Sequence, residues 1–408
     1  MLEVIGYYKK QHTSVKTALL DCSKAFDKCL FSALFQKCLD RGIPAIIVRG
    51  LLSIYEQQRC SVRWSNGIMS KEFGVGNGTR QGSCLSPALF SLYMDELLQE
   101  LRKAGVGCYI GGIFAGAGSY CDDLVLLSPS RSALQTQMTI CENYAKKYNL
   151  TFSTNPNPQK SKTKCLLFSH NKREEEPSPV YLNDTPLFWV KQAEHLGHML
   201  SDSGNQDKDC AMKRAAYIGE TTELLGIFKH ANPLQKLSAI QTYACSFYGS
   251  NLWDLYGPAA NKVYKSWQVS IRDAWGLPRQ TRTYLVDNLL SGTLSNVRQL
   301  ILRRYTKFVN NIFNSMNPVI STLAFWATRT LQSTTGKNVA NIRNEFADPL
   351  TCGSQKICIK RQDIPEGGYQ QIDLLARLLV LRNEEMDPDI LPEIDILIDN
   401  VCQERAMD

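Results

Sequence analysis

Two adjacent aspartates, Asp122 and Asp123, lie between two apolar stretches of the chain, Gly112 to Ala117 and Leu124 to Leu127. Apolar runs on both sides of a short polar segment are typical of a β-hairpin, so we predict a hairpin with both carboxylates at its tip. Earlier in the chain, a short apolar run ends in Asp21 and predicts a strand with a third carboxylate at its end. Three carboxylates at strand ends can converge.

Clustered carboxylates are the ligands that a pair of divalent cations requires. Two such ions, roughly 3.5–4 Å apart, hold the attacking and leaving oxygens of phosphoryl transfer. A lone Asp-Asp pair also occurs by chance, and it is then usually a solvated turn. The first hypothesis is therefore a two-metal nucleotidyl transferase, which needs support from other motifs.

Two further motifs stand in a fixed order with these carboxylates. The segment Gly78 to Ser83, followed by Leu85-Ser86-Pro87, lies between Asp21 and the Asp-Asp pair. The lysine-rich segment Lys160 to Lys164 comes after the pair and directly before another predicted strand. Four motifs in one order are far more specific than any one of them.

In this order the motifs resemble those of reverse transcriptases, most closely those of non-LTR (LINE-type) retrotransposons. Leu20 to Asp27 is similar to the first motif of the family's palm domain, Thr79 to Pro87 to the second, and Tyr120 to Asp123 to the third. The resemblance extends from about Lys16 to Ser201 and continues more weakly to about Leu285. It implies an RNA-directed DNA polymerase that binds an RNA template, a DNA primer and a dNTP.

The resemblance implies a role for each acidic residue. Asp21 and Asp122 would bridge two Mg²⁺ ions, or Mn²⁺ in their place, with the backbone carbonyl of Cys22 as an additional ligand. Asp123 is a weaker ligand candidate that orients the shell of the first ion. Oxygen ligands suit Mg²⁺, which retains water and shares substrate phosphates. One ion would lower the pKa of the primer 3′-hydroxyl, and the other would neutralise the leaving pyrophosphate.

Phe26 bears on the choice between DNA and RNA synthesis. Related RNA-synthesising polymerases tend to have an aspartate at this position, which accepts a hydrogen bond from the sugar 2′-hydroxyl. A phenyl ring would exclude that hydroxyl and leave it without a partner, so it favours deoxynucleotides. The alternative is that Phe26 is a core residue.

The second and fourth motifs supply candidate substrate contacts. Gly82 would let the backbone approach the nucleotide, the amide of Gln81 would bond its sugar or base, and Arg80 would hold phosphate or template. Lys162 is expected to donate a proton to pyrophosphate or to stabilise its charge. Lys160 and Lys164 are near alternatives, and a solvated lysine cluster is an equally open interpretation.

The formal net charge of +7 is unevenly distributed over the 408 residues. Residues 1–350 contain 40 basic and 27 acidic side chains, whereas residues 351–408 contain 6 basic and 12 acidic ones. A basic body favours a polyanionic partner through counterion release, although an ordinary basic protein would have the same charge. The motifs favour nucleic acid.

Cysteine usage and terminal sequence indicate the compartment. The 14 cysteines form no Cys-x-x-Cys pair, which favours a reducing compartment. His195 and His198 have no cysteine pair at zinc-finger spacing, so we expect structural roles for both. The N-terminus lacks signal-peptide features, and the uncharged run Cys108 to Cys121 is too short to span a bilayer. We expect an intracellular protein of the nucleus or cytoplasm that is neither secreted nor bound to a membrane.

The apolar periodicity between the motifs indicates the fold class. It predicts helices over Lys28 to Arg41, from an N-cap at Ser86 to Gly105, and over about Ser132 to Tyr148, followed by a strand over Cys165 to Ser169. This order predicts an α+β fold, which the resemblance makes a polymerase palm, with a ferredoxin-like antiparallel sheet and helices on one face. The opposite face is expected to stay uncovered, as a basic cleft for nucleic acid.

We expect four parts along the chain. They are a palm with truncated fingers (1–170), a linker and a hairpin like the family's primer grip (171–205), a mostly helical thumb and extension (206–345), and an acidic tail without an assigned role (346–408). Short strands are predicted over Tyr181 to Leu200, and a short apolar helix over Ile394 to Val401. Three tryptophans of the helical part are expected to pack between helices rather than to stack on bases, namely Trp253, Trp267 and Trp275.

Only twenty residues precede Asp21, where the family has a fingers region whose basic residues clasp the triphosphate. Loss of that clasp would remove charge stabilisation commonly worth about 3–4 kcal/mol of barrier. We therefore expect a truncated copy, without fingers or an endonuclease domain. Two hypotheses remain, an RNA-directed DNA polymerase and a catalytically inactive fragment that binds nucleic acid.

Overall fold

A computed structural model describes residues 1–80, 82–155, 157, 160–171, 174–281, 290 and 294–347. The chain divides into two compact units, Met1–Asn205 and Gln206–Asp408, and each has its own hydrophobic core. Gln81 and the predicted helix over Ile394 to Val401 lie outside the described residues, as does the tail beyond Ala347.

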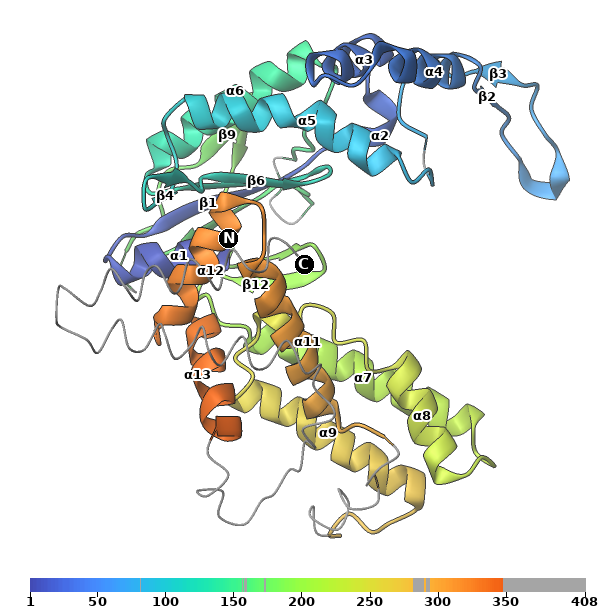
Figure 1. Ribbon diagram of the computed structural model, residues 1–408, viewed down its shortest axis with the longest axis vertical. Helices are drawn as coiled ribbons and strands as arrows, with labels where there is room; N and C mark the ends of the chain where they lie inside the picture. The colour runs from blue at the N-terminus through green and yellow to red at the C-terminus, as the bar shows by residue number, and fades with distance from the viewer. Residues whose placement is uncertain are drawn as a thin grey trace. The chain divides into compact units, whose positions relative to one another are not determined.

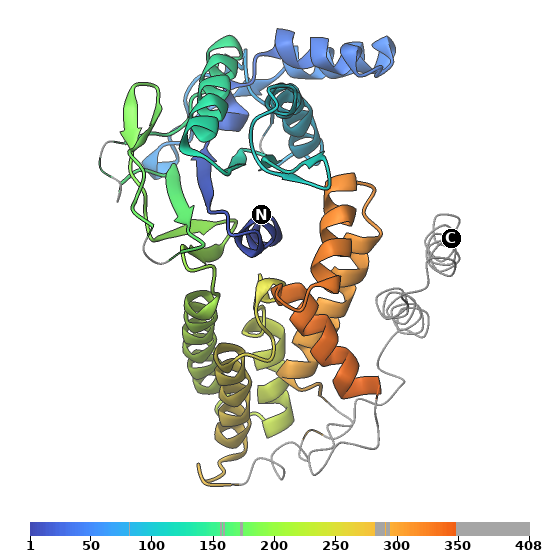
Figure 2. The same cartoon turned by 90° about the vertical axis from the view of Figure 1, so that its left-hand side faces the viewer.

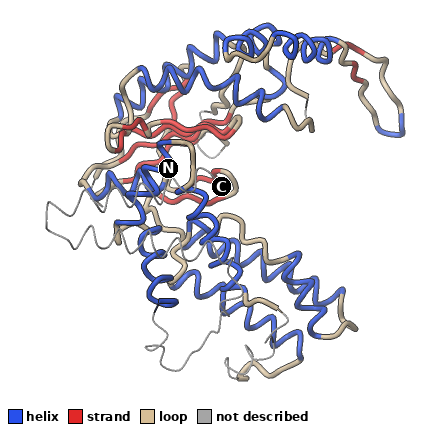
Figure 3. The backbone as a smooth tube through the Cα atoms, in the orientation of Figure 1, coloured by secondary structure: helices blue, strands red, loops and turns tan. Residues whose placement is uncertain are grey.

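The centre of the first unit is a four-stranded antiparallel sheet with the strand order β6-β7-β1-β8, drawn in red in Figure 3. Its strands are β1 (Val15–Asp21), β6 (Ala117–Tyr120), β7 (Asp123–Ser128) and β8 (Lys164–Phe168). The sheet confirms the predicted mixture of helices and antiparallel strands and the two strands predicted at Asp21 and Cys165.

Two long helices, α5 (Ser86–Lys103) and α6 (Arg131–Lys147), cover one face of this sheet (Figure 1). Both were predicted, with one difference in capping. Leu85 is the N-cap of α5, and Ser86 is its first helical residue, whose hydroxyl donates to the carbonyl of Arg80. The core between sheet and helices includes Ala18, Leu20, Leu124, Leu126, Phe90, Tyr93, Leu97, Met138 and Tyr144.

The helix predicted over Lys28 to Arg41 is present as α3 (Phe31–Asp40), and a separate short helix, α2 (Ala25–Lys28), precedes it. Leu30 lies between them in an extended conformation and forms a β-bridge with Asn77, which interrupts the helical hydrogen bonding. Our sequence reasoning did not predict α4 (Ala45–Glu56), which follows, or the two-residue strands β2 (Arg59–Cys60) and β3 (Phe73–Gly74).

The face of the sheet opposite α5 and α6 is covered in part, which corrects the prediction that it stays open. Helix α1 (Leu2–Lys10) packs against β1 on that face (Figure 2) and buries Val4 and Ile5. The sheet residues Leu19 and Leu166 on that face are only 4% and 0% exposed. The prediction failed because the apolar spacing within these first residues was not recognised as a helix.

The hairpin that carries the two aspartates is present, but Gly112 to Ala117 is not one strand. Its first part forms β5 (Ile113–Phe114), which pairs with β4 (Tyr109–Ile110) in a separate hairpin. Strand β6 begins only at Ala117 and pairs with β7.

Two small hairpins confirm the short strands predicted over Tyr181 to Leu200. They pair β9 (Val180–Leu182) with β10 (Thr185–Leu187) and β11 (Gln192–His195) with β12 (His198–Ser201). In the second hairpin His195 and His198 are the last pair before the turn.

The second unit is helical throughout its regular described elements. Trp253 and Trp267 are fully buried, and Trp275 packs against the same core, so the packing role predicted for these tryptophans is confirmed. The indole N–H of Trp253 donates to Asp209 at 2.7 Å. The elements are α7 (Asp207–Ile227), α8 (Pro233–Tyr243), the 3₁₀ helix η2 (Ser250–Leu252), α9 (Pro258–Trp275), α11 (Val297–Phe313), α12 (Pro318–Arg329) and α13 (Thr334–Ala347).

Candidate active site

Asp21 and Asp123 lie directly opposite each other on β1 and β7. The backbone carbonyl of Asp21 accepts a hydrogen bond from the N–H of Ser153 at 2.8 Å, and its own N–H donates to the hydroxyl of Thr163 at 3.4 Å. Both groups are therefore turned away from β7. Asp21 and Asp123 thus form a non-hydrogen-bonded pair, the arrangement in which opposite side chains of antiparallel strands approach most closely.

Asp122 lies in the tight turn that joins β6 to β7. Tyr120 pairs with Asp123 across this turn, so only Cys121 and Asp122 remain between the two strands. Cys121 has a φ of 52°, in the left-handed region that such short turns require. The register of the sheet consequently places all three aspartates at one edge.

Strand alternation sets the direction in which Asp21 points. Leu20 is buried in the core beneath α5 and α6, so its neighbour Asp21 lies on the opposite face of the sheet. Helix α1 covers that face near the beginning of β1, whereas Asp21 is at the end of the strand. The carboxylates therefore lie on the face that α5 and α6 leave free.

The charges at this edge are incompletely balanced. Burial raises the pKa of Asp123, and the neighbouring charges of Asp122 and Asp21 raise it further. Oδ2 of Asp21 is buried and has no hydrogen-bond partner among the described residues. Lys162 Nζ lies 3.8 Å from this oxygen, a distance typical of an ion pair. The site thus presents negative charge that a bound cation would offset.

Cys22 extends the site through its backbone. Hydrogen bonds join Ser23 to Thr151 and Ser153 to Asp21, and these two bonds flank the bridge between Cys22 and Phe152. This pattern directs the carbonyl of Cys22 away from Phe152, toward the β7 side where the other acidic residues lie. The thiol itself is buried, and burial raises its pKa to about 11.

The oxygen donors present fit Mg²⁺. No group of three or more His, Cys, Asp and Glu side chains among the residues that the structure describes is arranged to hold a metal as it stands. Mg²⁺ needs few protein ligands, because water and substrate phosphates complete its shell. The unpartnered oxygen of Asp21, the carboxylates of Asp122 and Asp123 and the carbonyl of Cys22 are hard donors of the type this ion prefers.

The first and second motifs are joined by backbone contacts. The N–H of Thr79 donates to the carbonyl of Phe26 at 2.6 Å, and the N–H of Gly78 donates to Cys29 at 2.8 Å. Gly78 has a φ of 92°, and a Cβ there would lie 2.9 Å from backbone atoms of Phe26 and Asp27. This contact therefore requires glycine.

Phe26 is half-buried. Its ring stacks on Phe90 with the ring centroids 4.9 Å apart, so part of the side chain packs against the core and part stays accessible. Arg80 and Gly82 follow Thr79 directly and are exposed. The hydrogen bond from Thr79 to Phe26 brings the beginning of the second motif close to Phe26 in space.

Among the three candidate lysines, Lys162 is the one that pairs with Asp21. Lys160 is exposed, and burial lowers the pKa of Lys164. The intervening Ser161 and Thr163 are buried, and the hydroxyl of Ser161 donates to the carbonyl of Thr163 at 2.7 Å. This alternation of buried hydroxyls with lysines directs Lys162 outward.

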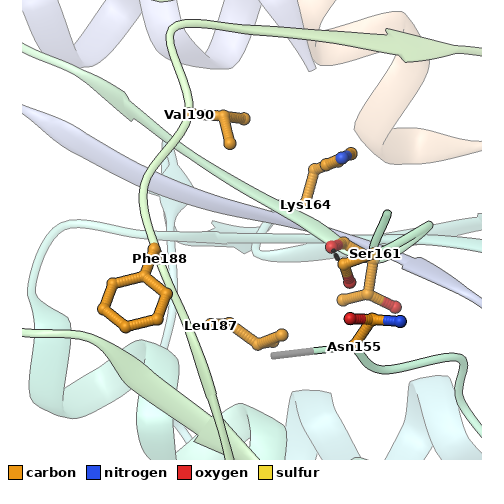
Figure 4. Close-up of a pocket in the computed structure, with 7 residues that line it drawn as sticks. Asn155, Ser161, Lys164, Leu187, Phe188 and Val190 are labelled. Atoms are coloured by element: carbon orange, nitrogen blue, oxygen red, sulfur yellow. Dashed lines mark hydrogen bonds between the residues drawn. The ribbon is translucent and has the colours of Figure 1, made fainter. Parts of the chain in front are cut away.

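Part of this segment lines a small pocket (Figure 4). Lys164 and Leu187 contribute to its walls from β8 and β10. Our sequence reasoning did not select Thr163, although it lines this pocket and contacts the backbone of Asp21. The alternation of Ser and Thr with lysine in this segment is the signal that would have found it. The pocket is lined by Asn155, Ser161, Thr163, Lys164, Leu187, Phe188 and Val190.

No helix in the described part of the chain combines the length and apolar character needed to cross a membrane.

The sequence is similar to proteins of a known family. Residues 3–200 match the family described as Reverse transcriptase (RNA-dependent DNA polymerase). The Retrovirus-related Pol polyprotein from type-2 retrotransposable element R2DM of Drosophila melanogaster is 35% identical over 132 residues, 32% of this chain and 12% of that protein. The Probable RNA-directed DNA polymerase from transposon X-element of the same species is 28% identical over 201 residues, 48% of this chain and 20% of that protein.

The chain therefore spans about a fifth or less of the length of these two relatives. A solved structure of apo telomerase from Candida Tropicalis aligns with 90% of this chain and 55% of its own, with a TM-score of 0.41 and 12% identity. The family match includes Asp21 and Asp123, the second motif between them and the lysine-rich motif that follows Asp123. Residues 3–200 thus form a reverse transcriptase domain like those of non-LTR retrotransposon Pol polyproteins.

Proposed function

We propose that this chain copies RNA into DNA by transferring dNTPs to a primer 3′-hydroxyl in a two-metal reaction. One observation carries the proposal. Asp21 and Asp123 form a non-hydrogen-bonded pair at one sheet edge, and Asp122 lies in the adjoining turn. Within a reverse transcriptase domain, this is the arrangement that a carboxylate-bound metal pair would use.

Each acidic residue then has a distinct task. When bound, Mg²⁺ or Mn²⁺ would activate the primer hydroxyl and neutralise the leaving pyrophosphate. Asp21 and Asp122 would hold both ions, and the carbonyl of Cys22 would complete the set. Asp123 would orient this shell. Its raised pKa makes it less ready than an ordinary aspartate to stay ionised before a cation arrives.

The remaining site residues would act on the nucleotide. Phe26, stacked on Phe90, would exclude a 2′-hydroxyl with the accessible part of its ring. Lys162 would leave Asp21 and place its charge, or its proton, at the pyrophosphate. Arg80 would hold phosphate or template, and Gln81 and Gly82 would support the sugar and base.

Each part of the chain would have its own role in holding the template and primer. Residues 1–170 would be the palm, residues 171–205 would support the primer 3′ end, and residues 206–345 would form the thumb. The partners would be an RNA template, a DNA primer and a dNTP. The site of action would be the nucleus or the cytoplasm.

Primer extension tests this function. Purified protein is given an RNA template, an annealed DNA primer, Mg²⁺ and dNTPs, with Asp122→Asn as the blank because it removes charge without changing volume. Extension by the wild type alone supports the proposal. Absence of extension, with salt-sensitive RNA binding intact in both proteins, would favour a fragment that binds nucleic acid without catalysis.

A further inference from the structure

The segment Arg59–Gly74, here called the arm, forms a hairpin that extends from the end of α4 away from the sheet and its covering helices (Figures 1 and 3). Its base is held by the β2–β3 pairing and by a hydrogen bond from the N–H of Val75 to the carbonyl of Gln58 at 3.2 Å. Its tip is the turn Ser65–Gly67, in which Asn66 and Gly67 have left-handed φ values of 68° and 79°.

The register of the arm gives it two different faces. Arg63 bridges to Met69, and the flanking hydrogen bonds join Trp64 to Ile68 at 2.7 Å and Ser70 to Val62 at 2.9 Å. Paired residues share a face and successive residues alternate. One face of the tip therefore carries the apolar residues Val62, Trp64 and Ile68, and the other carries Arg63 and Met69.

The apolar face is uncovered. Trp64 is 69% exposed and Ile68 is 64% exposed, although their backbones are fixed by a direct hydrogen bond. Exposed apolar side chains that adjoin one another mark a binding site more often than single ones do. The hydrogen bond between them places Trp64 and Ile68 directly on either side of the turn.

The charge on the arm indicates what covers this face. From Arg59 to Gly74 the arm contains three basic side chains, Arg59, Arg63 and Lys71, and one acidic side chain, Glu72. This net positive charge favours a polyanion over a basic or neutral surface. Basic side chains interleaved with an exposed indole are also the combination that binds bases and phosphates together.

The size of the face argues against a protein partner held by the arm alone. Three side chains of this kind offer about 400 Å², roughly half of what each partner buries in a stable protein interface. A wedge between base pairs needs only one or two apolar side chains, because its role is to separate a base step. The tip meets that requirement.

We propose that the arm is a strand-separating wedge, in which Trp64 and Ile68 pack against the last base pair of a nucleic-acid duplex and Arg63 contacts its phosphates. The inference rests on the proposed polymerase function, because a polymerase that copies a paired template must open the duplex ahead of it. Val62 would extend the apolar surface behind the tip. Met69 shares the other face with Arg63 but carries no charge for a phosphate, so it would take no part.

The first test compares two templates that differ only ahead of the primer. One has a single-stranded downstream region, and the other has a complementary strand annealed there. Trp64→Ala combined with Ile68→Ala should leave extension on the open template unchanged and slow extension on the blocked template by about tenfold. Trp64→Phe should retain most of the rate on both templates.

Two matched controls remove exposed apolar residues elsewhere. Met69→Ala alters the other face of the arm, and Ile54→Ala alters the neighbouring helix α4, where that side chain is 58% exposed. Both should behave as wild type on both templates. Equal slowing on both templates by the tip variant, or an Ile54→Ala effect as large as that of the tip, would assign the face to another partner and overturn the proposal.

A second measurement separates the wedge from the polymerase function. A fluorescent base analogue at the end of the blocking duplex brightens when it is unstacked, and no dNTP is needed. Wild-type protein should increase this fluorescence, and the tip variant should not. An increase without primer extension would retain the wedge and reject the polymerase proposal, whereas equal fluorescence with both proteins would reject the wedge.

Discussion

Lys162 Nζ lies 3.8 Å from Oδ2 of Asp21, a buried oxygen to which none of the described residues donates a hydrogen bond. A bound metal ion and this ammonium group would compete for the same oxygen. The side chain of Lys162 is 71% exposed, so solvent screens the pair and its contribution to stability is small. The lysine can therefore leave Asp21 at little cost when a cation binds.

Metal binding should depend on Asp21. We expect Asp21→Asn to weaken Mn²⁺ binding by tenfold or more, because it removes the carboxylate that the structure leaves unsatisfied. Electron paramagnetic resonance of free Mn²⁺ measures this without turnover. Asp40→Asn, which alters an exposed carboxylate on α3, serves as the control. Equal loss of Mn²⁺ affinity in both variants would remove Asp21 from the metal site.

Replacing different lysines of the fourth motif should affect the incorporation rate to different extents. Lys162→Ala is expected to lower the maximal rate of incorporation about tenfold to a hundredfold, because it removes a charge that would act on pyrophosphate. Lys160→Ala, which removes another exposed lysine two residues away, should change the rate less than twofold. Pre-steady-state incorporation of one nucleotide measures both. Similar rates for the two variants would support a solvated lysine cluster.

Sugar selection should depend on the bulk of Phe26. Phe26→Ala is expected to raise ribonucleotide incorporation relative to deoxynucleotide incorporation by at least about tenfold, since a steric exclusion is lost. Phe26→Tyr retains the ring and should retain the selection. The ratio of kcat/KM for a dNTP and its matching NTP measures the effect. An unchanged ratio in the alanine variant, with a lower Tm, would assign Phe26 to the core alone.

The raised pKa of Asp123 predicts a pH-dependent stability. A carboxyl group with a raised pKa binds its proton more tightly in the folded state, so its stabilising contribution is present below about pH 3.9 and is lost as the pH rises through the folded pKa. Asp123→Asn does not titrate. The variant should therefore gain Tm relative to wild type as the pH rises from 4 to 7 in metal-free buffer.

Thermal unfolding at a series of pH values measures this difference, and it should be small because Asp123 is only partly buried. Added Mg²⁺ should raise the Tm of the wild type more than that of the variant. A Tm difference that stays constant from pH 4 to pH 7 would show that burial and the neighbouring carboxylates do not raise the pKa of Asp123.

The strongest local patterns were sufficient to predict the sheet that carries the site. A strand that ends in Asp21 and a hairpin that carries Asp122 and Asp123 follow from apolar runs and from the turn between them. Their exact pairing does not, because the register that places Asp21 opposite Asp123 joins two strands about a hundred residues apart in the sequence.

Other elements escaped prediction for definable reasons. Helices α1 and α4 lie outside the motifs. The packing of α1 on the sheet and the exposure of apolar residues of α4 depend on the tertiary fold, which local sequence patterns do not reveal. The extended conformation of Leu30, which delays the start of α3, accompanies its bridge to Asn77, just before the second motif. The buried hydroxyl of Thr163 looked like an ordinary polar residue, since only the fold places it beside the backbone of Asp21.

The most direct test of the account is single-turnover incorporation of one dNTP by wild type and by the Asp21→Asn, Asp122→Asn and Asp123→Asn variants, with Asp40→Asn as the control. The account predicts that incorporation is lost in the first two variants, is reduced in the third, and is unchanged in the control, while all five proteins bind RNA equally. Incorporation at the wild-type rate by Asp21→Asn or Asp122→Asn would contradict the assignment of this carboxylate edge as the catalytic centre.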